Sequence, residues 1–196
     1  WSLYPHMTAC WNFLIDEVFA HLEKRPRFFF DLVDPSSRSD DDILDMQAAL
    51  KRFAGIGDVT LGLNQNEANI LCRLNKLNAL PAKDPEAAAI QGRALRQHLG
   101  LNEVVIHSIK YAVGVDASSE AQVYGPYCEA PRKSTGAGDR FNAGYALGLV
   151  LGCEWRDRLT LACASSGFFV RQAHSANLEE LASFLENSGS ERSGIT

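Results

Sequence analysis

The hydrophobic residues of this chain follow two patterns, one with helical spacing and one in short uninterrupted runs. Apolar residues three or four positions apart form one face of an amphipathic helix, so the first pattern predicts helices that pack against a core. Thr8 is placed to cap the first of them, and Gly55 and Gly57 end the second. We expect helices over residues 8–24, 40–54, 64–77, 84–99, 154–173 and 177–187, and another directly after residue 135.

Three short apolar runs lie between these helices, over residues 27–33, 58–63 and 103–109. Strands that are buried on both faces, as in parallel sheets, carry apolar residues without alternation. Strands and helices also alternate here with short connections, for which a right-handed parallel arrangement is the usual solution. Two further β candidates, 111–117 and 121–127, are joined by a polar turn and predict an antiparallel hairpin.

The predicted fold class is therefore α/β, with a mainly parallel sheet flanked by helices and a small antiparallel hairpin at its edge. The chain contains no internal repeat and no low-complexity linker that would separate two domains. We expect one folded unit over residues 1–187, followed by a flexible polar tail over residues 188–196.

Composition argues against several classes of function. The 196 residues include 19 Lys and Arg against 24 Asp and Glu, a net charge of -5. Non-specific binding to nucleic acid or anionic membranes needs a basic excess, so neither partner is expected. No apolar run approaches the ~20 residues that span a bilayer, and the N-terminal segment lacks the features of a signal peptide. The five cysteines are widely spaced and form no C-x-x-C pair, which predicts free, mostly buried thiols in a cytoplasmic protein.

A glycine-rich turn, Thr135-Gly136-Ala137-Gly138-Asp139, opens an apolar helix. Glycines at a helix start allow close approach of a ligand, and the free N–H groups with the helix dipole favour an anion. Asp139 has two interpretations: it complements the helix dipole as a first-turn acid, or it acts as a general base. As a base it would take a proton from a substrate hydroxyl, while the N–H groups of Gly136, Ala137 and Gly138 stabilise a transferring phosphoryl group.

Asn64 and Glu67 open the third predicted helix directly after a strand. One interpretation is structural: Asn64 is the N-cap, and Glu67 completes a capping box three residues later. The other is functional, because this position lies at the C-terminal edge of a parallel sheet, where α/β folds bind ligands. Glu67 could there order a water bound to Mg²⁺, which keeps several waters and uses few protein carboxylates. The two interpretations are compatible with each other.

Two motifs of the chain together resemble the ribokinase-like (PfkB) carbohydrate kinase family. The segment STGAGDRFNAGYALGLVLG resembles the family's second signature, and Asn64-x-x-Glu67 in LGLNQNEA resembles its N-x-x-E motif. The resemblance implies ATP-dependent phosphorylation of a sugar or sugar-like hydroxyl, with Mg²⁺. It implies that Asp139 is the catalytic base and that Gly136, Ala137 and Gly138 form the anion hole. Asn64 and Glu67 would organise the metal and the phosphates.

The resemblance also places the nucleotide near residues 105–112 and near the helix that carries residues 162–166. The nucleotide-binding residues that the resemblance implies are His107, Lys110 and Ala162 from these segments, with Ser134 and Thr135 from the glycine-rich signature.

The chain departs from the family pattern in places. Lys133 stands where the family has its leading Asp, and an ammonium group cannot bind the monovalent cation that this Asp helps to bind. We therefore expect no K⁺ requirement for catalysis. The usual T-x-G is replaced by HSI at residues 107–109; either His107 or Lys110 contacts phosphate instead, or Lys110 is a solvated residue at a strand end. Asp34, in the loop after the first strand, is either functional or forms an Asx-turn.

The resemblance covers the whole chain but only the nucleotide-binding, catalytic part of the family's length. The sugar-binding N-terminal part of the fold and its β lid are not visible, and the chain begins with Trp1 rather than Met. We therefore expect a piece of a longer carbohydrate kinase, in which any homo-oligomer would form through parts absent from this sequence. The alternative is a non-catalytic nucleotide-binding or regulatory module that has kept the fold. Asp139 favours the kinase, because a binding module has no need of a base.

Overall fold

The computed structural model describes residues 1–77 and 81–192. The chain divides into two compact units, each with its own internal packing. The first comprises Trp1–His107 and Val113–Glu120, and the second comprises Ser108–Ala112 and Ala121–Thr196.

Five strands form a mixed sheet in the order β1-β2-β3-β4-β5. The strands are β1 (Arg27–Asp31), β2 (Asp58–Asn64), β3 (Glu103–His107), β4 (Tyr111–Val115) and β5 (Glu120–Tyr124). The first three are parallel neighbours. The last two follow through tight turns, in which the N–H of Ser108 donates to the carbonyl of Tyr111 and the N–H of Asp116 to that of Ser119. The predicted α/β class, with an antiparallel hairpin at the sheet edge, is confirmed.

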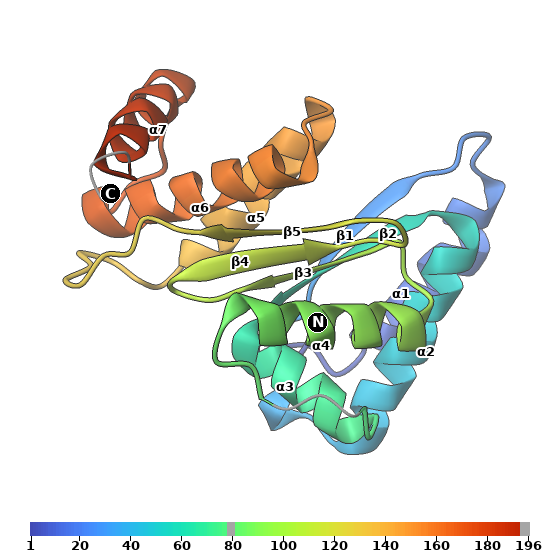
Figure 1. Ribbon diagram of the computed structural model, residues 1–196. Coiled ribbons are helices and arrows are strands. Elements are labelled where there is room, and N and C mark those ends of the chain that lie inside the picture. The colour runs from blue at the N-terminus through green and yellow to red at the C-terminus, as the bar shows by residue number, and fades with distance from the viewer. Residues whose placement is uncertain (78–80, 193–196) are drawn as a thin grey trace. The chain divides into compact units, whose positions relative to one another are not determined.

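Four helices belong to the first unit, and α2, α3 and α4 lie along one face of β1–β3 (Figure 1). They are α1 (Met7–Glu17), α2 (Asp40–Ile56), α3 (Gln65–Leu74) and α4 (Pro85–Leu99), with 3₁₀ turns η1 (Phe19–His21) and η2 (Pro35–Ser37). Local side chains fix where α2 and α4 begin. Ser39 accepts a hydrogen bond from the N–H of Asp42, and Asp84 accepts one from the N–H of Ala87. Gly100, with φ 67°, ends α4 in the left-handed conformation that glycine adopts without strain.

The core of the first unit includes an aromatic cluster around Phe53 of α2. The rings of Phe28 and Phe30, both on β1, each lie 4.8 Å from the ring of Phe53 between centroids. Trp11 of α1 reaches the same ring at 6.1 Å. Strand β2 runs between β1 and β3, and its side chains at 59–63 are all buried. The central position of β2 in the sheet explains why its residues form a continuous, mostly apolar run.

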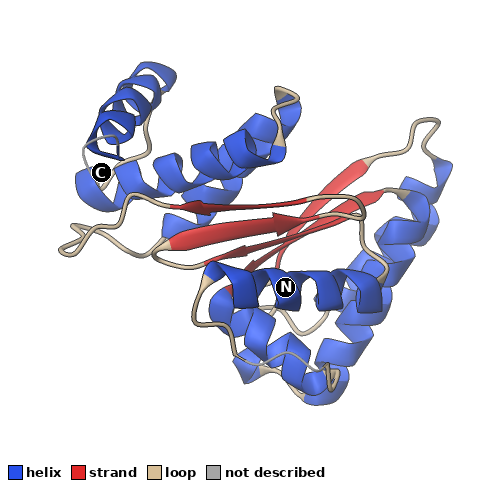
Figure 2. Cartoon of the chain, in the orientation of Figure 1, coloured by secondary structure: helices blue, strands red, loops and turns tan. Residues whose placement is uncertain are grey.

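The second unit is mostly helical, as the helices α5–α7 in Figure 2 show. These helices are α5 (Ala137–Val150), α6 (Trp155–Gln172) and α7 (Leu178–Arg192). Close packing of α5 on α6 is possible because Gly144 has no side chain: a Cβ there would lie 2.7 Å from the carbonyl oxygen of Leu161. Tyr145, fully buried, packs beside Trp155 at 6.1 Å between ring centroids.

Several predicted element boundaries are wrong. The first helix ends at Glu17 rather than residue 24, and the 3₁₀ turn η1 follows it. Thr8 does not cap this helix; its hydroxyl accepts a hydrogen bond from the indole N–H of Trp1 at 2.8 Å, and the N-cap is His6. Gly55 lies inside α2, so Gly57 alone ends that helix.

The predicted strand over 27–33 is shorter and less buried than its apolar run suggests. Only Phe30 is buried within β1, because β1 is the edge strand of the sheet. The third strand ends at His107 rather than 109, since the hydroxyl of Ser108 accepts the N–H groups of Lys110 and Tyr111 and forms a turn. The predicted tail from residue 188 begins inside α7, which continues to Arg192; residues 193–196 lie outside the described part of the chain.

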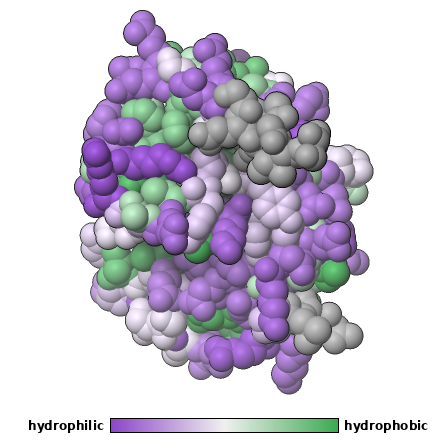
Figure 3. Space-filling view, turned by 60° about the vertical axis from the view of Figure 1, so that its left-hand side comes forward, coloured by the Kyte–Doolittle hydropathy of each residue, from purple (hydrophilic) through white to green (hydrophobic). Residues whose placement is uncertain are grey.

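No helix among the described residues is long and apolar enough to cross a membrane. On the face drawn in Figure 3, hydrophobic side chains form small groups among hydrophilic ones. All five cysteines are free, but only Cys72 is buried, so the prediction of mostly buried thiols is wrong. Burial raises the pKa of the Cys72 thiol to about 11, which keeps it protonated.

Candidate active site

The carboxyl ends of three parallel strands meet at one edge of the first unit. In the strand register, Asp31 of β1 is paired with Gly62 of β2, and Asn64 of β2 with His107 of β3. Ligands of α/β proteins bind at this edge, where the strand ends and the following loops present polar groups. The predicted residues Asn64, Glu67 and His107 are therefore brought to one place.

Asn64 and Glu67 form a complete capping box at the start of α3. The side-chain oxygen Oδ1 of Asn64 accepts the N–H of Glu67 at 3.0 Å, and Oε2 of Glu67 accepts the N–H of Asn64 at 2.8 Å. The structural interpretation of this pair is confirmed. Each side chain satisfies a backbone N–H that the helix leaves without a partner.

Glu67 is only 3% exposed, and its environment is unusual for a carboxylate. Burial raises the pKa of Glu67 to about 7, and the negative charges of Asp31 and Asp34 add to this rise. The hydrogen bond from the backbone of Asn64 acts in the opposite direction. The carboxyl group is therefore about half ionised near neutral pH. A cation at this edge would favour the ionised form.

His107, at the end of β3, is neutral at physiological pH. Burial lowers its pKa to about 4, although the negative charge of Asp31 partly opposes this effect. A neutral imidazole can donate or accept one hydrogen bond at each nitrogen, but it adds no positive charge.

Asp34 forms an Asx-turn, which was the structural one of its two interpretations. Its Oδ1 accepts the N–H of Ser36 at 3.0 Å and caps the turn η2, with Pro35 at the first position. The carboxylate also lies close enough to Glu67 to raise the pKa of that group.

The second unit carries the glycine-rich turn. Gly136 has φ 92°, a conformation that side chains rarely adopt, and it directly precedes α5. The N–H of Ala137 donates to the carbonyl of Ser134 at 3.0 Å and is already paired. Within the described chain, no acceptor is recorded for the N–H groups of Gly138 and Asp139. The turn thus presents unpaired donors at the positive end of a helix, which suits an anion.

Asp139 stands on the first turn of α5 with its side chain 73% exposed. One of its carboxylate oxygens lies 3.6 Å from Nη1 of Arg140. The carboxylate is therefore accessible to a ligand at the start of α5.

The other predicted nucleotide-binding residues also belong to the second unit. Lys110 is exposed in the turn before β4, where its ammonium group lies 5.4 Å from the ring centroid of Tyr127. Ala162 is fully buried where α6 packs on α5, with its Cα 2.8 Å from the position of a Cβ on Gly144. Ser134 supports the turn through its carbonyl, and Thr135 is exposed beside it.

Residues 1–188 match the family described as prokaryotic ketohexokinase. The chain belongs to this family. The resemblance to ribokinase-like carbohydrate kinases, inferred from the two motifs, is thereby confirmed.

Several individual proteins are similar to this chain of the prokaryotic ketohexokinase family. The ketohexokinase of Haloferax volcanii is 28% identical over 189 residues, which cover 94% of this chain and 48% of that protein. A mutant phosphofructokinase-2 from Escherichia coli has a similar structure, with TM-score 0.64 at 14% identity over 91% of this chain and 62% of that one. Ribokinase from Thermotoga maritima gives TM-score 0.59 at 18% identity over 87% and 52%. The structures show the shared fold, and the chain spans about half the length of the curated relative.

Two charged residues of this ketohexokinase-family chain, one in each unit, lie beside predicted site residues and were missed by sequence reasoning. Asp31 ends β1 at the edge that carries Glu67 and His107, and its charge acts on both. The sequence feature that could have pointed to Asp31 was a carboxylate at the end of an apolar run. Arg140 follows Asp139 directly, but nothing in its spacing indicated that its side chain returns to the turn.

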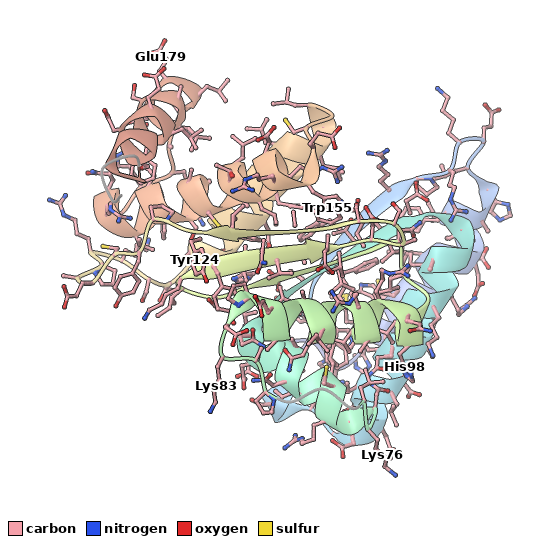
Figure 4. All side chains as sticks on the ribbon, in the orientation of Figure 1. Lys76, Lys83, His98, Tyr124, Trp155 and Glu179 are labelled. Carbon is pink, nitrogen blue, oxygen red and sulfur yellow. The ribbon has the colours of Figure 1, made fainter. Side chains whose placement is uncertain are left out.

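An amide network between α3 and α4 was also missed. Buried Gln91 donates to Asn69 at 2.8 Å and accepts from Gln65 at 2.6 Å. The network holds α4 against the helix that Asn64 and Glu67 begin. The sequence does not show which polar residues of a helix are buried. Gln91 is buried, whereas His98 on the same helix is exposed (Figure 4).

Proposed function

We propose that the complete protein transfers a phosphoryl group from ATP to a hydroxyl of a ketohexose or a closely similar sugar. The observation that carries the proposal is the GAGD turn with its unpaired N–H groups and exposed Asp139, in a chain of the prokaryotic ketohexokinase family. The curated relative is named ketohexokinase, which directs the choice of sugar.

In this proposal Asp139 is the general base. Its carboxylate accepts the proton of the attacking sugar hydroxyl as the new O–P bond forms. The N–H groups at the start of α5 then stabilise the negative charge on the transferring phosphoryl oxygens. The N–H groups of Gly136 and Gly138 are better placed for this than that of Ala137, which donates to Ser134.

The backbone N–H donors of the glycine-rich turn fit a nucleotide phosphate that binds together with Mg²⁺. Among the described residues no three His, Cys, Asp or Glu side chains converge as a metal cage, which suits an ion that keeps most of its waters. Glu67, with Asp31 and Asp34 near it, supplies negative charge that such an ion would offset. When bound, Mg²⁺ would neutralise charge on the phosphates. We propose that Asn64 and Glu67 hold it through water, and that Ser134, Thr135, His107, Lys110 and Ala162 lie near the nucleotide.

Replacement of the base tests the function. We expect Asp139→Asn in the complete protein to reduce the rate of fructose phosphorylation about 10²- to 10⁴-fold, as for the loss of a general base. Binding of Mg-ATP, measured by calorimetry, should persist in this variant. Asp157→Asn is the matched control, because Asp157 is an exposed acid in the first turn of α6.

Two outcomes would reject the proposal in different ways. Full activity of Asp139→Asn, with Asp157→Asn also active, would show that Asp139 is not the base. Binding of Mg-ATP by the wild-type protein without phosphorylation of any ketohexose, aldose or nucleoside would instead support a non-catalytic nucleotide-binding module.

A further inference from the structure

The guanidinium group of Arg140 returns to the glycine turn and contacts three groups around it. Its Cζ lies 4.6 Å from the ring centroid of Phe169, and its Nε donates to the hydroxyl of Ser175 at 3.0 Å. Its Nη1 lies 3.6 Å from Oδ2 of Asp139. All of these residues belong to the second unit, so the arrangement is internal to one compact body.

Neighbouring positions on a helix do not normally face each other, because successive side chains point about 100° apart. Asp139 and Arg140 are adjacent, and they meet only because the Arg140 side chain bends back towards the start of α5. The guanidinium lies against the ring of Phe169, which is almost fully buried. Cation–π contact and the hydrogen bond to Ser175 hold the guanidinium in place from two other directions.

Gly136 provides the space for this arrangement. A Cβ at Gly136 would lie 3.2 Å from Nη1 of Arg140 and 3.6 Å from the ring of Phe169. The positive φ of Gly136 already disfavours a side chain, and a Cβ there would in addition move the guanidinium by a few tenths of an ångström. The guanidinium therefore lies in van der Waals reach of the turn.

Stability alone does not account for the pair. An exposed ion pair contributes little to folding because water screens it, and Asp139 is 73% exposed. Lys133 lies over the same Phe169 ring at 5.4 Å, so a second cation is already available for packing on that ring. What Arg140 adds is a fixed positive group beside the Asp139 carboxylate.

We propose that Arg140 is a positioning residue that orients the carboxylate of Asp139 towards the substrate hydroxyl. The inference rests on the proposed role of Asp139 as the base. The guanidinium limits the rotation of the Asp139 side chain and keeps one carboxylate oxygen engaged, which leaves the other oxygen to accept the proton. Arg140 acts through Asp139 and does not itself touch the transferred proton.

A double-mutant cycle separates this role from others. We expect Arg140→Gln in the complete protein to lower kcat about 10- to 100-fold, as small displacements of a catalytic group do. The KM values for ATP and fructose should change little. In the Asp139→Asn background, Arg140→Gln should cause no further loss, because a residue that acts only through Asp139 has nothing left to position.

Three further variants sharpen the test. Arg140→Lys should recover part of kcat, since an ammonium can still approach the carboxylate. Ser175→Ala removes one anchor and should cause a smaller loss than Arg140→Gln. Arg156→Gln is the control for loss of charge, because Arg156 is exposed on α6 and its side chain forms no ion pair among the described residues.

A measurement independent of activity guards against a variant that folds poorly. In ¹⁵N spectra of the wild-type protein, the Nε–H of Arg140 should exchange slowly with water because Ser175 accepts it. Asp139→Asn and Ser175→Ala should both change this signal. If the signal resembles those of freely exposed arginines in the wild type, the proposal is wrong.

The kinetic outcomes distinguish this proposal from the proposed function. If Asp139→Asn loses activity and Arg140→Gln does not, Arg140 is not a positioning residue, while Asp139 remains the base. A raised KM for ATP with unchanged kcat would make Arg140 a nucleotide-binding group and overturn the positioning role. Losses that multiply in the double variant would also overturn it. Full activity of Asp139→Asn would instead reject the base itself.

Discussion

The N–H of Asn64 donates to the Glu67 carboxylate at 2.8 Å, and the N–H of Glu67 donates back to the Asn64 side chain at 3.0 Å. This reciprocal pair starts α3 directly at the carboxyl end of β2. Because the same Glu67 is buried beside Asp31 and Asp34, the residue that caps the helix also carries a carboxyl group with a pKa of about 7. Capping geometry and an unusual charge state are thus combined in one side chain, and each can be tested.

The raised pKa of Glu67 predicts how stability depends on pH. The ordinary value is 4.5 and the folded-state value is about 7, so the folded protein holds this proton more tightly than the unfolded chain. The free energy of unfolding should therefore fall as pH rises from about 4.5 to about 7 and then stay at the lower level. A shift of this size corresponds to about 3 kcal/mol. Glu67→Gln keeps the hydrogen-bond acceptor, cannot ionise, and should lack this decline.

Urea unfolding at pH 5 and pH 8 measures the difference. Glu67→Gln should gain stability relative to the wild type on going from pH 5 to pH 8. Glu86→Gln is the control, because Glu86 is an exposed acid in the first turn of α4. Parallel pH profiles for the wild type and Glu67→Gln would contradict the assignment.

Asp31 should influence two groups at once. Its negative charge raises the pKa of Glu67 and opposes the lowering of the His107 pKa. We therefore expect Asp31→Asn to lower both pKa values, as NMR titration of the carboxyl carbon and the imidazole would show. Asp41→Asn, which removes an exposed charge in the first turn of α2, should leave both unchanged. A shift in only one of the two groups would mean that Asp31 does not act on both.

A side chain at Gly144 should destabilise the packing of α5 on α6. A Cβ there would lie 2.7 Å from the carbonyl oxygen of Leu161 and 2.8 Å from the Cα of Ala162, both backbone atoms of α6. We expect Gly144→Ala to reduce the free energy of unfolding by about 1–3 kcal/mol, as overpacking does. Gly55→Ala is the control: its Cβ would meet nothing within 4 Å, and alanine favours the helix by up to about 1 kcal/mol. If thermal and urea unfolding showed the same change in stability for Gly144→Ala and Gly55→Ala, the packing argument would be contradicted.

Catalysis should not depend on K⁺. By the resemblance to ribokinase-like kinases, Lys133 stands where the family has its leading Asp, and its ammonium group lies 5.4 Å from the ring centroid of Phe169. Since a fixed positive charge repels a monovalent cation, the phosphorylation rate of the complete protein should be the same in K⁺ and Na⁺ salts of equal ionic strength. A large rate increase in K⁺ would show that the ion binds without this Asp. If the prediction holds, Lys133→Asp should gain a rate response to K⁺, because it restores a carboxylate at this position.

Elements with strong local signals were predictable. Asp84 before Pro85 and Gly100 after Leu99 mark both ends of α4, and the structure has those ends. Capping side chains and left-handed glycines act within a few residues, so they are readable from sequence. The end of the first helix and the exposure of β1 were not predictable in this way. Both depend on what packs against them: β1 is an edge strand, although its apolar run reads as buried.

The sequence by itself determined the family motifs, the capping box and the glycine turn, because each depends on residue types at short, fixed spacing. Only the tertiary structure decided the charge state of Glu67 and His107, since burial and the charge of Asp31 come from segments distant in the chain. It also decided that Arg140 lies beside Asp139, because Phe169 and Ser175 hold the guanidinium there. Turns and helix caps depend on residues that are neighbours in sequence. The electrostatic environment of a side chain depends on all the groups that folding places around it, including those from distant segments.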